Sequence, residues 1–198
     1  MSDGVPPYFV HPTATVEDEV SIGSETRIWH HAQVRRGARI GERCILGKGA
    51  FVDSDVVVGD DCKIQNYACV YHGVTLGRGV FIGPAVVFTN DLHPRATDPS
   101  FTLLRDGDWE VGVTVVDDGA AIGANSTILP NVRIGKWALV GAASVVTRDV
   151  PPYALAVGSP ARVVGWVCRC GVKVESPRCE RCGELPEDHP LHSTSAVR

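Results

Sequence analysis

Apolar residues recur at every sixth position over most of this chain, and this period limits what the chain can fold into. The series is unbroken at Val10, Val16, Ile22, Ile28, Val34, Ile40, Leu46, Val52, Val58, Ile64, Val70, Leu76, Ile82 and Phe88, and it resumes at Val116, Ile122, Ile128, Ile134, Val140 and Val146. A period of six matches neither the period of a helix, about 3.6 residues, nor the alternation of a single strand. It is typical of a chain that coils with a triangular cross-section, each six-residue unit supplying one short strand and one corner. Stacked coils then share one continuous core.

Two other positions follow the same period. The position two before each apolar residue is small or β-branched at Ala14, Thr26, Ala32, Ala38, Cys44, Ala50, Cys62, Ala68, Ala120, Ser126, Ala138 and Ser144. Such residues suit the narrow interior of a prism. Glycine follows the apolar residue at positions 23, 41, 47, 59, 77, 83, 123, 135 and 141. We expect these glycines to turn the corners, because a residue without Cβ tolerates tight turns.

The repeat divides the 198-residue chain into segments. Residues 1–9 form a lead-in, and residues 10–147 form an all-β, parallel β-helix of hexapeptide repeats. A long loop excursion over residues 91–115 interrupts the coils, since the 28 positions between Phe88 and Val116 are not a multiple of six. A proline-rich exit segment follows over residues 148–167, then a cysteine-rich tail over 168–183 and an end, 184–198, that we expect to be flexible. Long excursions from a rigid scaffold often carry function.

Composition excludes several classes of protein. The net charge of −4 offers no electrostatic reason to expect a nucleic acid partner. No apolar run approaches the roughly 18 residues that span a membrane, and the first residues lack the pattern of a secretory signal. We therefore expect a cytoplasmic protein with no membrane partner. The seven cysteines are an odd number, which argues against a disulfide framework.

The resemblance to a known family lies in the segments KIQNYACVYHGVTLGRGVFIGPAVVFTNDLHPRA (63–96), GAAIGANSTILPNVRIGKWALVGAASVVTRDVPPYALAVGSPARVVGW (119–166) and TRIWHHAQV (26–34). These segments resemble the hexapeptide-repeat acyltransferases, and within them the branch that acetylates the amino group of nucleotide-linked (UDP or dTDP) 3-amino sugars. The resemblance implies a left-handed coil, an exception to the usual right-handed crossover. It also implies a homotrimer with active sites between subunits, acetyl-CoA as co-substrate and a role in glycan or antibiotic sugar assembly.

The resemblance implies three candidate catalytic residues. Asn90 ends the last regular coil before the loop and matches an active-site asparagine of the branch. His93 stands before proline, as in the catalytic loop of the related sugar O-acetyltransferases. His72 stands after a tyrosine, where the branch more often has an acidic residue. Either imidazole is a plausible general base, and the alternative for each of the three is an ordinary loop or corner residue.

Polar residues of the same stretch are candidates for binding the sugar or the nucleotide: Gln65, Asn66, Tyr71 and Arg95. Asn66 has an equally good explanation as one member of an asparagine ladder along the coil. Arg95 is suited to a nucleotide phosphate. Tyr67 replaces an asparagine that is usual in the branch, which leaves the nucleotide open.

The last two coils are expected to bind CoA. Its pantetheine arm requires a groove lined by small residues, for which Gly123, Ala124, Gly141 and Ala142 are the candidates. Arg148 and Arg162 follow closely enough in the sequence to contact the phosphates of CoA. Solvated surface arginines are the alternative.

The tail carries two close pairs of cysteines, Cys168 with Cys170 and Cys179 with Cys182, each followed by glycine. Four thiolates in this arrangement suit tetrahedral structural zinc, although the first pair is shorter than the usual ribbon spacing. A tail of this length buries too little core to fold unaided, so metal would supply its folding energy.

Other functions remain open at this point. One is a sugar O-acetyltransferase that uses His93 as base, and another is a non-enzymatic β-helix scaffold. A γ-class carbonic anhydrase requires two zinc-binding histidines about five residues apart, and the histidines at positions 11, 30, 31, 72 and 93 include no such pair.

Overall fold

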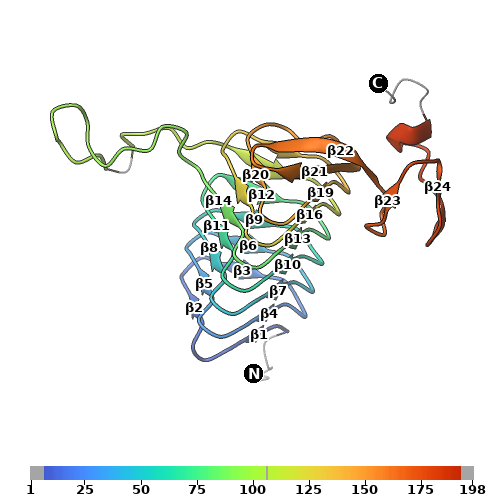
Figure 1. The fold of residues 1–198 in the computed structure, drawn as a ribbon. Coiled ribbons are helices and arrows are strands. Elements are labelled where there is room, and N and C mark those ends of the chain that lie inside the picture. The colour runs from blue at the N-terminus through green and yellow to red at the C-terminus, as the bar shows by residue number, and fades with distance from the viewer. Residues whose placement is uncertain (1–6, 106, 193–198) are drawn as a thin grey trace.

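A computed structural model describes residues 7–105 and 107–192, and these residues form a triangular prism with two appendages (Figure 1). Three sheets make the faces of the prism. From β1 to β20 the paired strands are parallel, and each pairs with a strand three elements away along the chain. Register follows the 18-residue turn: Phe9 pairs with Arg27, Thr15 with Gln33. The all-β, parallel β-helix expected from the six-residue period is therefore confirmed.

Sheet A contains β1 (Phe9–Val10), β4 (Arg27–Ile28), β7 (Ile45–Leu46), β10 (Lys63–Ile64), β13 (Phe81–Ile82), β16 (Ala121–Ile122), β19 (Leu139–Val140), β21 (Ala154–Gly158), β22 (Ala161–Val167) and β23 (Lys173–Val174). Sheet B contains β2 (Thr15–Val16), β5 (Gln33–Val34), β8 (Phe51–Val52), β11 (Cys69–Val70), β14 (Val87–Phe88), β17 (Thr127–Ile128) and β20 (Val145–Val146). Sheet C contains β3 (Ser21–Ile22), β6 (Arg39–Ile40), β9 (Val57–Val58), β12 (Val74–Leu76), β15 (Thr114–Val116) and β18 (Arg133–Ile134). We name the corners that join successive sheets A–B, B–C and C–A.

The apolar series forms the core, as expected. From Ile28 onward its members are buried, whereas Val10, Val16 and Ile22 in the first coil are only half-buried because no coil stacks below them. The small positions from Thr26 onward are also buried, and several of them bond to the next coil. The Thr26 hydroxyl donates to the carbonyl of Gly41 at 2.8 Å, and the Ser126 hydroxyl donates to that of Gly141 at 3.1 Å. Polar groups at these positions are therefore satisfied inside the prism.

The glycines that follow the apolar residues have a different role from the one expected. Their φ angles lie outside the left-handed region, and each faces the neighbouring coil at close range. A Cβ on Gly23 would lie 2.5 Å from the backbone nitrogen of Glu42, and one on Gly123 would lie 2.4 Å from that of Ala142. The chain instead turns each corner three positions after the apolar residue, through positive φ at Glu19, Glu25, His31, Arg43, Asp55, Asp61, Tyr67, Ala85, Asn125, Asn131, Trp137 and Ala143 among others. Close approach between coils, and not the turn, selects glycine there.

The loop excursion projects sideways from the B–C corner as an extended arm, which we define as residues 91–113 (Figure 1). It ends two residues earlier than expected, because Thr114 already pairs with Val74 in sheet C. Within the arm a bridge joins Thr97 to Leu103, and the Asp98 carboxylate accepts the amides of Ser100 and Thr102.

The coil also continues beyond residue 147, into the segment expected as an exit. Val150 bridges to Ile134, and β21 stacks in parallel on β19. The chain then reverses, and β22 pairs antiparallel with β21. At the other end, Phe9 belongs to β1 and not to a lead-in; residues 1–6 lie outside the described residues.

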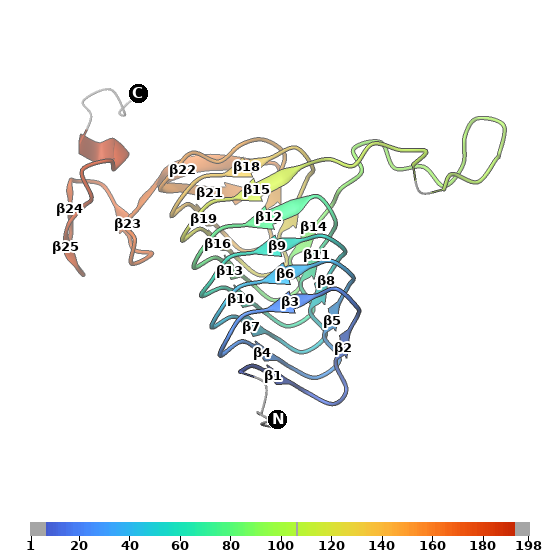
Figure 2. The same cartoon turned by 180° about the vertical axis from the view of Figure 1, so that it is seen from behind.

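The cysteine-rich tail lies on the side of the prism opposite the arm (Figure 2). Beyond β23 it contains a hairpin of β24 (Arg178–Cys179) and β25 (Gly183–Glu184), then a short 3-10 helix, Pro190–His192. Residues 184–198 are expected to be flexible, and the described part of this segment, residues 184–192, packs against the rest of the protein. Leu185 and His189 are buried, and Asp188 accepts a hydrogen bond from Tyr153 of the prism at 2.9 Å. Residues 193–198 lie outside the described residues.

Candidate active site

The B–C corner brings together two of the three predicted catalytic residues. His72 and Asn90 occupy equivalent positions in successive coils, and the Asn90 side-chain amide donates to the backbone carbonyl of His72 at 3.3 Å. Asn90 also holds the root of the arm, because its own carbonyl accepts the amide of Gly112 at 2.8 Å. The arm therefore leaves and rejoins the prism beside this pair.

The imidazole of His72 has a defined orientation. Its Nδ1 lies 2.8 Å from the backbone carbonyl of Ser54 and 3.9 Å from a carboxylate oxygen of Asp55, and 41 % of the side chain is exposed. A carbonyl only accepts hydrogen bonds, so Nδ1 must carry the proton. In the neutral ring Nε2 then has the free lone pair, which is the state that a general base requires.

A column of charged residues supports this corner from below. The carboxylate of Asp53, 9 % exposed, accepts the backbone amides of His72 at 3.2 Å and Ser54 at 2.8 Å. It also accepts a guanidinium hydrogen bond from Arg35 at 3.1 Å, and Arg35 lies 3.5 Å from Glu17 in the coil below. The sequence analysis missed this column. Its signal is the 18-residue spacing of Glu17, Arg35 and Asp53, one coil apart.

The residues proposed to bind substrate lie at two different corners of this chain. Tyr71 lies at the B–C corner beside His72, and its ring packs edge-on against Phe51 with 5.6 Å between centroids. Gln65 and Asn66 lie at the A–B corner, on the other side of strand β11. The side-chain oxygen Oδ1 of Asn66 accepts the backbone amide of Lys48 at 2.9 Å, so Asn66 connects two neighbouring coils.

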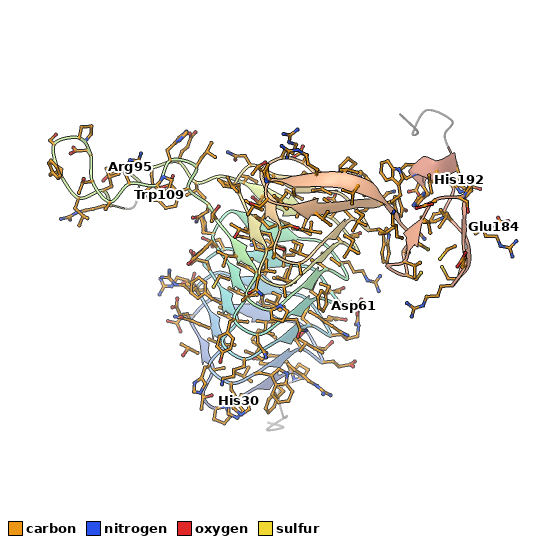
Figure 3. The ribbon with its side chains drawn as sticks, viewed as in Figure 1. His30, Asp61, Arg95, Trp109, Glu184 and His192 are labelled. Atoms are coloured by element: carbon orange, nitrogen blue, oxygen red, sulfur yellow. The ribbon has the colours of Figure 1, made fainter. Side chains whose placement is uncertain are left out.

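His93 and Arg95 lie within the arm and not beside His72 in this chain. They line a cavity of about 520 Å³ together with Asp91, Trp109, Glu110 and Asn131. Both Arg95 and Trp109 are labelled in the arm in Figure 3. The amide of His93 is bonded to the carboxylate of Asp91 at 2.8 Å, and the Arg95 guanidinium donates to the carbonyl of Pro94 at 2.7 Å.

The residues proposed to bind CoA form two groups. Gly123, Ala124, Gly141 and Ala142 stack at the A–B corner. The amides of Gly123 and Gly141 already donate to Val140 and Ala156, so these glycines offer space and not free donors. Arg148 and Arg162 line one cavity of about 240 Å³ at the C-terminal end of the prism. The sequence separates these two arginines, and the fold brings them together.

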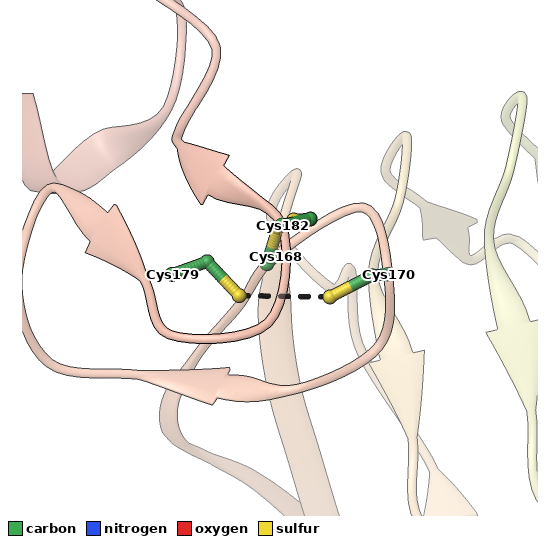
Figure 4. Close-up of side chains that lie close together, drawn as sticks. All are labelled: Cys168, Cys170, Cys179 and Cys182. Carbon is green, nitrogen blue, oxygen red and sulfur yellow. Dashed lines mark hydrogen bonds between the residues drawn. The ribbon is translucent and has the colours of Figure 1, made fainter.

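The four tail cysteines converge, as Figure 4 shows. Their sulfur atoms lie within 4.8 Å of one another, with 3.2 Å between Cys168 and Cys182 and 3.6 Å between Cys170 and Cys179. In a zinc tetrahedron with Zn–S bonds of about 2.3 Å, sulfurs are about 3.8 Å apart. Backbone hydrogen bonding, first from Arg181, lowers the pKa of Cys179 to about 7, which favours the thiolate that a metal binds. The donor set and the spacing fit a metal ion.

Among the described residues, the remaining cysteines do not form a second metal site. All seven are free thiols, and Cys44 and Cys62 are buried fillers that donate to backbone carbonyls.

No described helix is long and apolar enough to cross a bilayer.

Comparisons with known proteins agree with this geometry. The model of the bacterial transferase hexapeptide (six repeats) matches residues 55–90, and that of the hexapeptide repeat of succinyl-transferase matches residues 37–66 and 113–148. The chain is 47 % identical over 175 residues to the dTDP-3-amino-3,6-dideoxy-alpha-D-galactopyranose 3-N-acetyltransferase of Aneurinibacillus thermoaerophilus. This alignment covers 88 % of this chain and 86 % of the relative.

Solved structures share the fold. PerB from Caulobacter crescentus, in complex with CoA and GDP-perosamine, has a TM-score of 0.50 and 26 % identity. The alignment covers 79 % of this chain and 56 % of PerB. A mutant of AntD, an N-acyltransferase from Bacillus cereus in complex with dTDP and coenzyme A, has a TM-score of 0.51 and 20 % identity, with 81 % of each chain covered.

The repeat, the interrupted β-helix and the relative that matches most of the chain agree with one another. The β-helix is left-handed, as hexapeptide repeats imply. The chain belongs to the hexapeptide-repeat acyltransferases, and within this family it is similar to the nucleotide-linked 3-amino-sugar N-acetyltransferases.

Proposed function

We propose that the protein transfers an acetyl group from acetyl-CoA to the amino group of a UDP- or dTDP-linked 3-amino sugar. The observation that carries this proposal is the His72–Asn90 pair at the root of the arm, in a chain 47 % identical to a dTDP-3-amino-sugar N-acetyltransferase. Such a sugar belongs to glycan or antibiotic sugar assembly. Both substrates are cytoplasmic metabolites, so we place the enzyme in the cytoplasm.

The reaction requires a neutral amine held against a thioester. His72 Nε2 accepts the proton that the amine loses as its nitrogen bonds to the acetyl carbonyl carbon. The carbon–sulfur bond then breaks, and the imidazolium returns the proton to the departing thiolate. Asn90 donates through its amide nitrogen to His72, which leaves its oxygen to accept a hydrogen bond from the amine and orient it.

The O-acetyltransferase alternative relies on His93. In favour of His72 is the carbonyl that fixes its tautomer, whereas His93 bonds Asp91 through its backbone amide. The arm cavity supports a different role for the residues around His93. With Trp109 and Arg95 on its walls, it suits the nucleotide, with the guanidinium near a phosphate.

A homotrimer would bring the A–B corner of one copy beside the B–C corner of another. The outward residues of sheet B carry no charge: Thr15, Gln33, Phe51, Cys69, Val87, Thr127 and Val145. Sheets A and C expose Arg27, Lys63, Arg39 and Arg133 on their outer faces. If three copies place sheet B toward a threefold axis, the A–B corner of one copy lies beside the B–C corner of the next. Gln65, Asn66 and the small residues of the CoA groove then face His72 and Asn90 across the interface.

Two further assignments follow. Arg148 and Arg162 contact the phosphates of CoA at the end of the prism, where they share a cavity. The four tail cysteines bind one structural Zn²⁺, supported by their converging sulfurs. A closed Cys₄ site leaves no open coordination position, so it takes no part in the chemistry.

The test incubates the full-length protein with acetyl-CoA and a panel of UDP- and dTDP-linked 3-amino sugars, together with their 3-hydroxy counterparts. Release of CoA thiol is followed, and the sugar products are analysed by mass spectrometry. Acetylation of an amino sugar without reaction of its hydroxyl counterpart supports the proposal. Reaction of the hydroxyl sugars alone would replace it with O-acetylation.

A further inference from the structure

The carboxylate of Asp53 is buried and bonds the backbone of two successive coils. We propose that Asp53 is a positioning residue for catalysis, which holds His72 in the tautomer with a free Nε2. This inference rests on the proposed function, since it assigns to His72 the role of base. Asp53 acts through His72 and does not contact the substrate.

The hydrogen bonds of Asp53 divide between its two oxygens. Oδ1 accepts the amide of Ser54 at 2.8 Å and the guanidinium of Arg35 at 3.1 Å, and Oδ2 accepts the amide of His72 at 3.2 Å. The imidazole Nδ1 in turn faces the carbonyl of Ser54 at 2.8 Å. One carboxylate therefore holds the amide of Ser54, the residue whose carbonyl faces the ring, and the amide of His72, the residue that carries the ring. Arg35 holds the carboxylate.

The direction of these bonds fixes the proton on the ring. A free imidazole in water favours the tautomer with hydrogen on Nε2, which would leave no lone pair toward the amine. The Ser54 carbonyl selects the opposite tautomer, because it can only accept a hydrogen bond and Nδ1 must therefore carry the hydrogen. The charged groups near the ring are Asp55, 3.9 Å from Nδ1, and Asp53 itself at the His72 backbone. The peptide group that carries the Ser54 carbonyl is also held by the Asp55 amide, which donates to the carbonyl of Arg36 at 3.1 Å. Without Asp53, the backbones of Ser54 and His72 lose the bonds that keep this carbonyl and the ring aligned, and the selection weakens.

The same chain supplies a matched comparison at another corner. Asp60 accepts the backbone amide of Glu42 at 2.8 Å, one coil below, at the C–A corner. No predicted catalytic residue lies there. A carboxylate that only caps a coil should behave like Asp60 when it is changed to asparagine. A positioning residue should show effects that Asp60→Asn does not.

The experiment compares Asp53→Asn, Asp60→Asn, His72→Gln and the Asp53→Asn/His72→Gln double variant in the full-length enzyme. Asp53→Asn turns an amide N–H toward groups that themselves donate to Asp53, so at least one of these bonds is lost. Because His72 is then less well positioned, we expect kcat to fall by about tenfold or more. The KM for acetyl-CoA should stay within about twofold. Asp60→Asn should keep the wild-type kcat. The double variant should be no slower than His72→Gln alone, because both changes remove the same contribution.

A second measurement requires no turnover. Nitrogen-15 shifts of histidine side chains report which ring nitrogen carries the proton, and the His72 signal is assigned from its loss in His72→Gln. We expect an Nδ1–H ring in wild type and in Asp60→Asn, and a shift toward Nε2–H in Asp53→Asn. An unchanged tautomer in Asp53→Asn overturns the inference, as do equal kcat values for the two asparagine variants. A wild type that acetylates no amino sugar would contradict the proposed function, and the tautomer would still decide this inference.

Discussion

Asn90 lies one coil above His72, and its side-chain amide donates to the His72 carbonyl at 3.3 Å. The bond joins the last regular coil before the arm to the coil beneath it. It directs the amide nitrogen of Asn90 into the prism corner and leaves the oxygen for a substrate amine. The arrangement of the proposed site therefore depends on the stacking of two coils.

Replacing Asn90 with alanine should lower kcat by about a hundredfold, the size expected for loss of one preorganised hydrogen-bonding group. Steady-state kinetics on the amino sugar measure this effect. Asp118→Ala is the matched control, because Asp118 also bonds a neighbouring coil, accepting the amide of Arg78 at 2.8 Å, but lies at the C–A corner. It should cost about 1 kcal/mol in the free energy of unfolding and change kcat much less. Equal kcat losses in the two variants would contradict the role given to Asn90.

Arg148→Ala and Arg162→Ala should each weaken CoA binding by about tenfold, since each removes one charge-assisted contact worth about 1.4 kcal/mol. Titration calorimetry with CoA measures the change in Kd. Arg39→Ala removes an exposed arginine from the outer face of sheet C and should leave Kd unchanged. If all three variants bind CoA like the wild type, its phosphates lie elsewhere.

Zinc should be present at one ion per chain in protein purified without chelator, and absent from Cys182→Ser. Elemental analysis measures the content. Because the tail buries few residues of its own, loss of metal should expose residues 168–192 to protease. The β-helix should remain folded, as read by circular dichroism. A wild-type protein that is free of metal and equally protease-resistant would refute the metal site.

Acid should reduce the contribution that Asp61, at the C–A corner, makes to the free energy of unfolding. Hydrogen bonds first from Arg43 and then from Arg78 lower the pKa of Asp61 to about 2. A carboxyl with a depressed pKa in the folded state stabilises above its unfolded pKa, and that stability disappears as pH falls through the folded pKa. The difference in denaturation midpoint between wild type and Asp61→Asn should therefore shrink between about pH 4 and about pH 2. A difference that stays constant over this window would count against the ion pairs.

The six-residue period was sufficient to predict the sheets, the core and the place of the arm. It misassigned the glycines after each apolar residue, because the sequence shows which residue is small but not what it faces. Position 123 requires glycine because the backbone of Ala142 in the next coil leaves no space for a Cβ. The period likewise placed Asn66 and Tyr71 on one coil without showing that a strand separates them.

Contacts between distant segments explain the other differences. Asp188 and His189 belong to a polar, proline-containing end that suggests flexibility, yet they pack on Tyr153, which lies 35 residues earlier. The column of Glu17, Arg35 and Asp53 resembles ordinary surface charge until the coils are stacked. His93 and His72 are equally plausible bases in the sequence, and only the Ser54 carbonyl distinguishes them.

The most direct test of the central claim is kcat for wild type and His72→Gln on the amino sugar that the enzyme acetylates best. With His72 as base, the variant should be slower by about a hundredfold or more at saturating substrate, with the KM for acetyl-CoA within about twofold of the wild-type value. A variant with the wild-type kcat would contradict the assignment of His72.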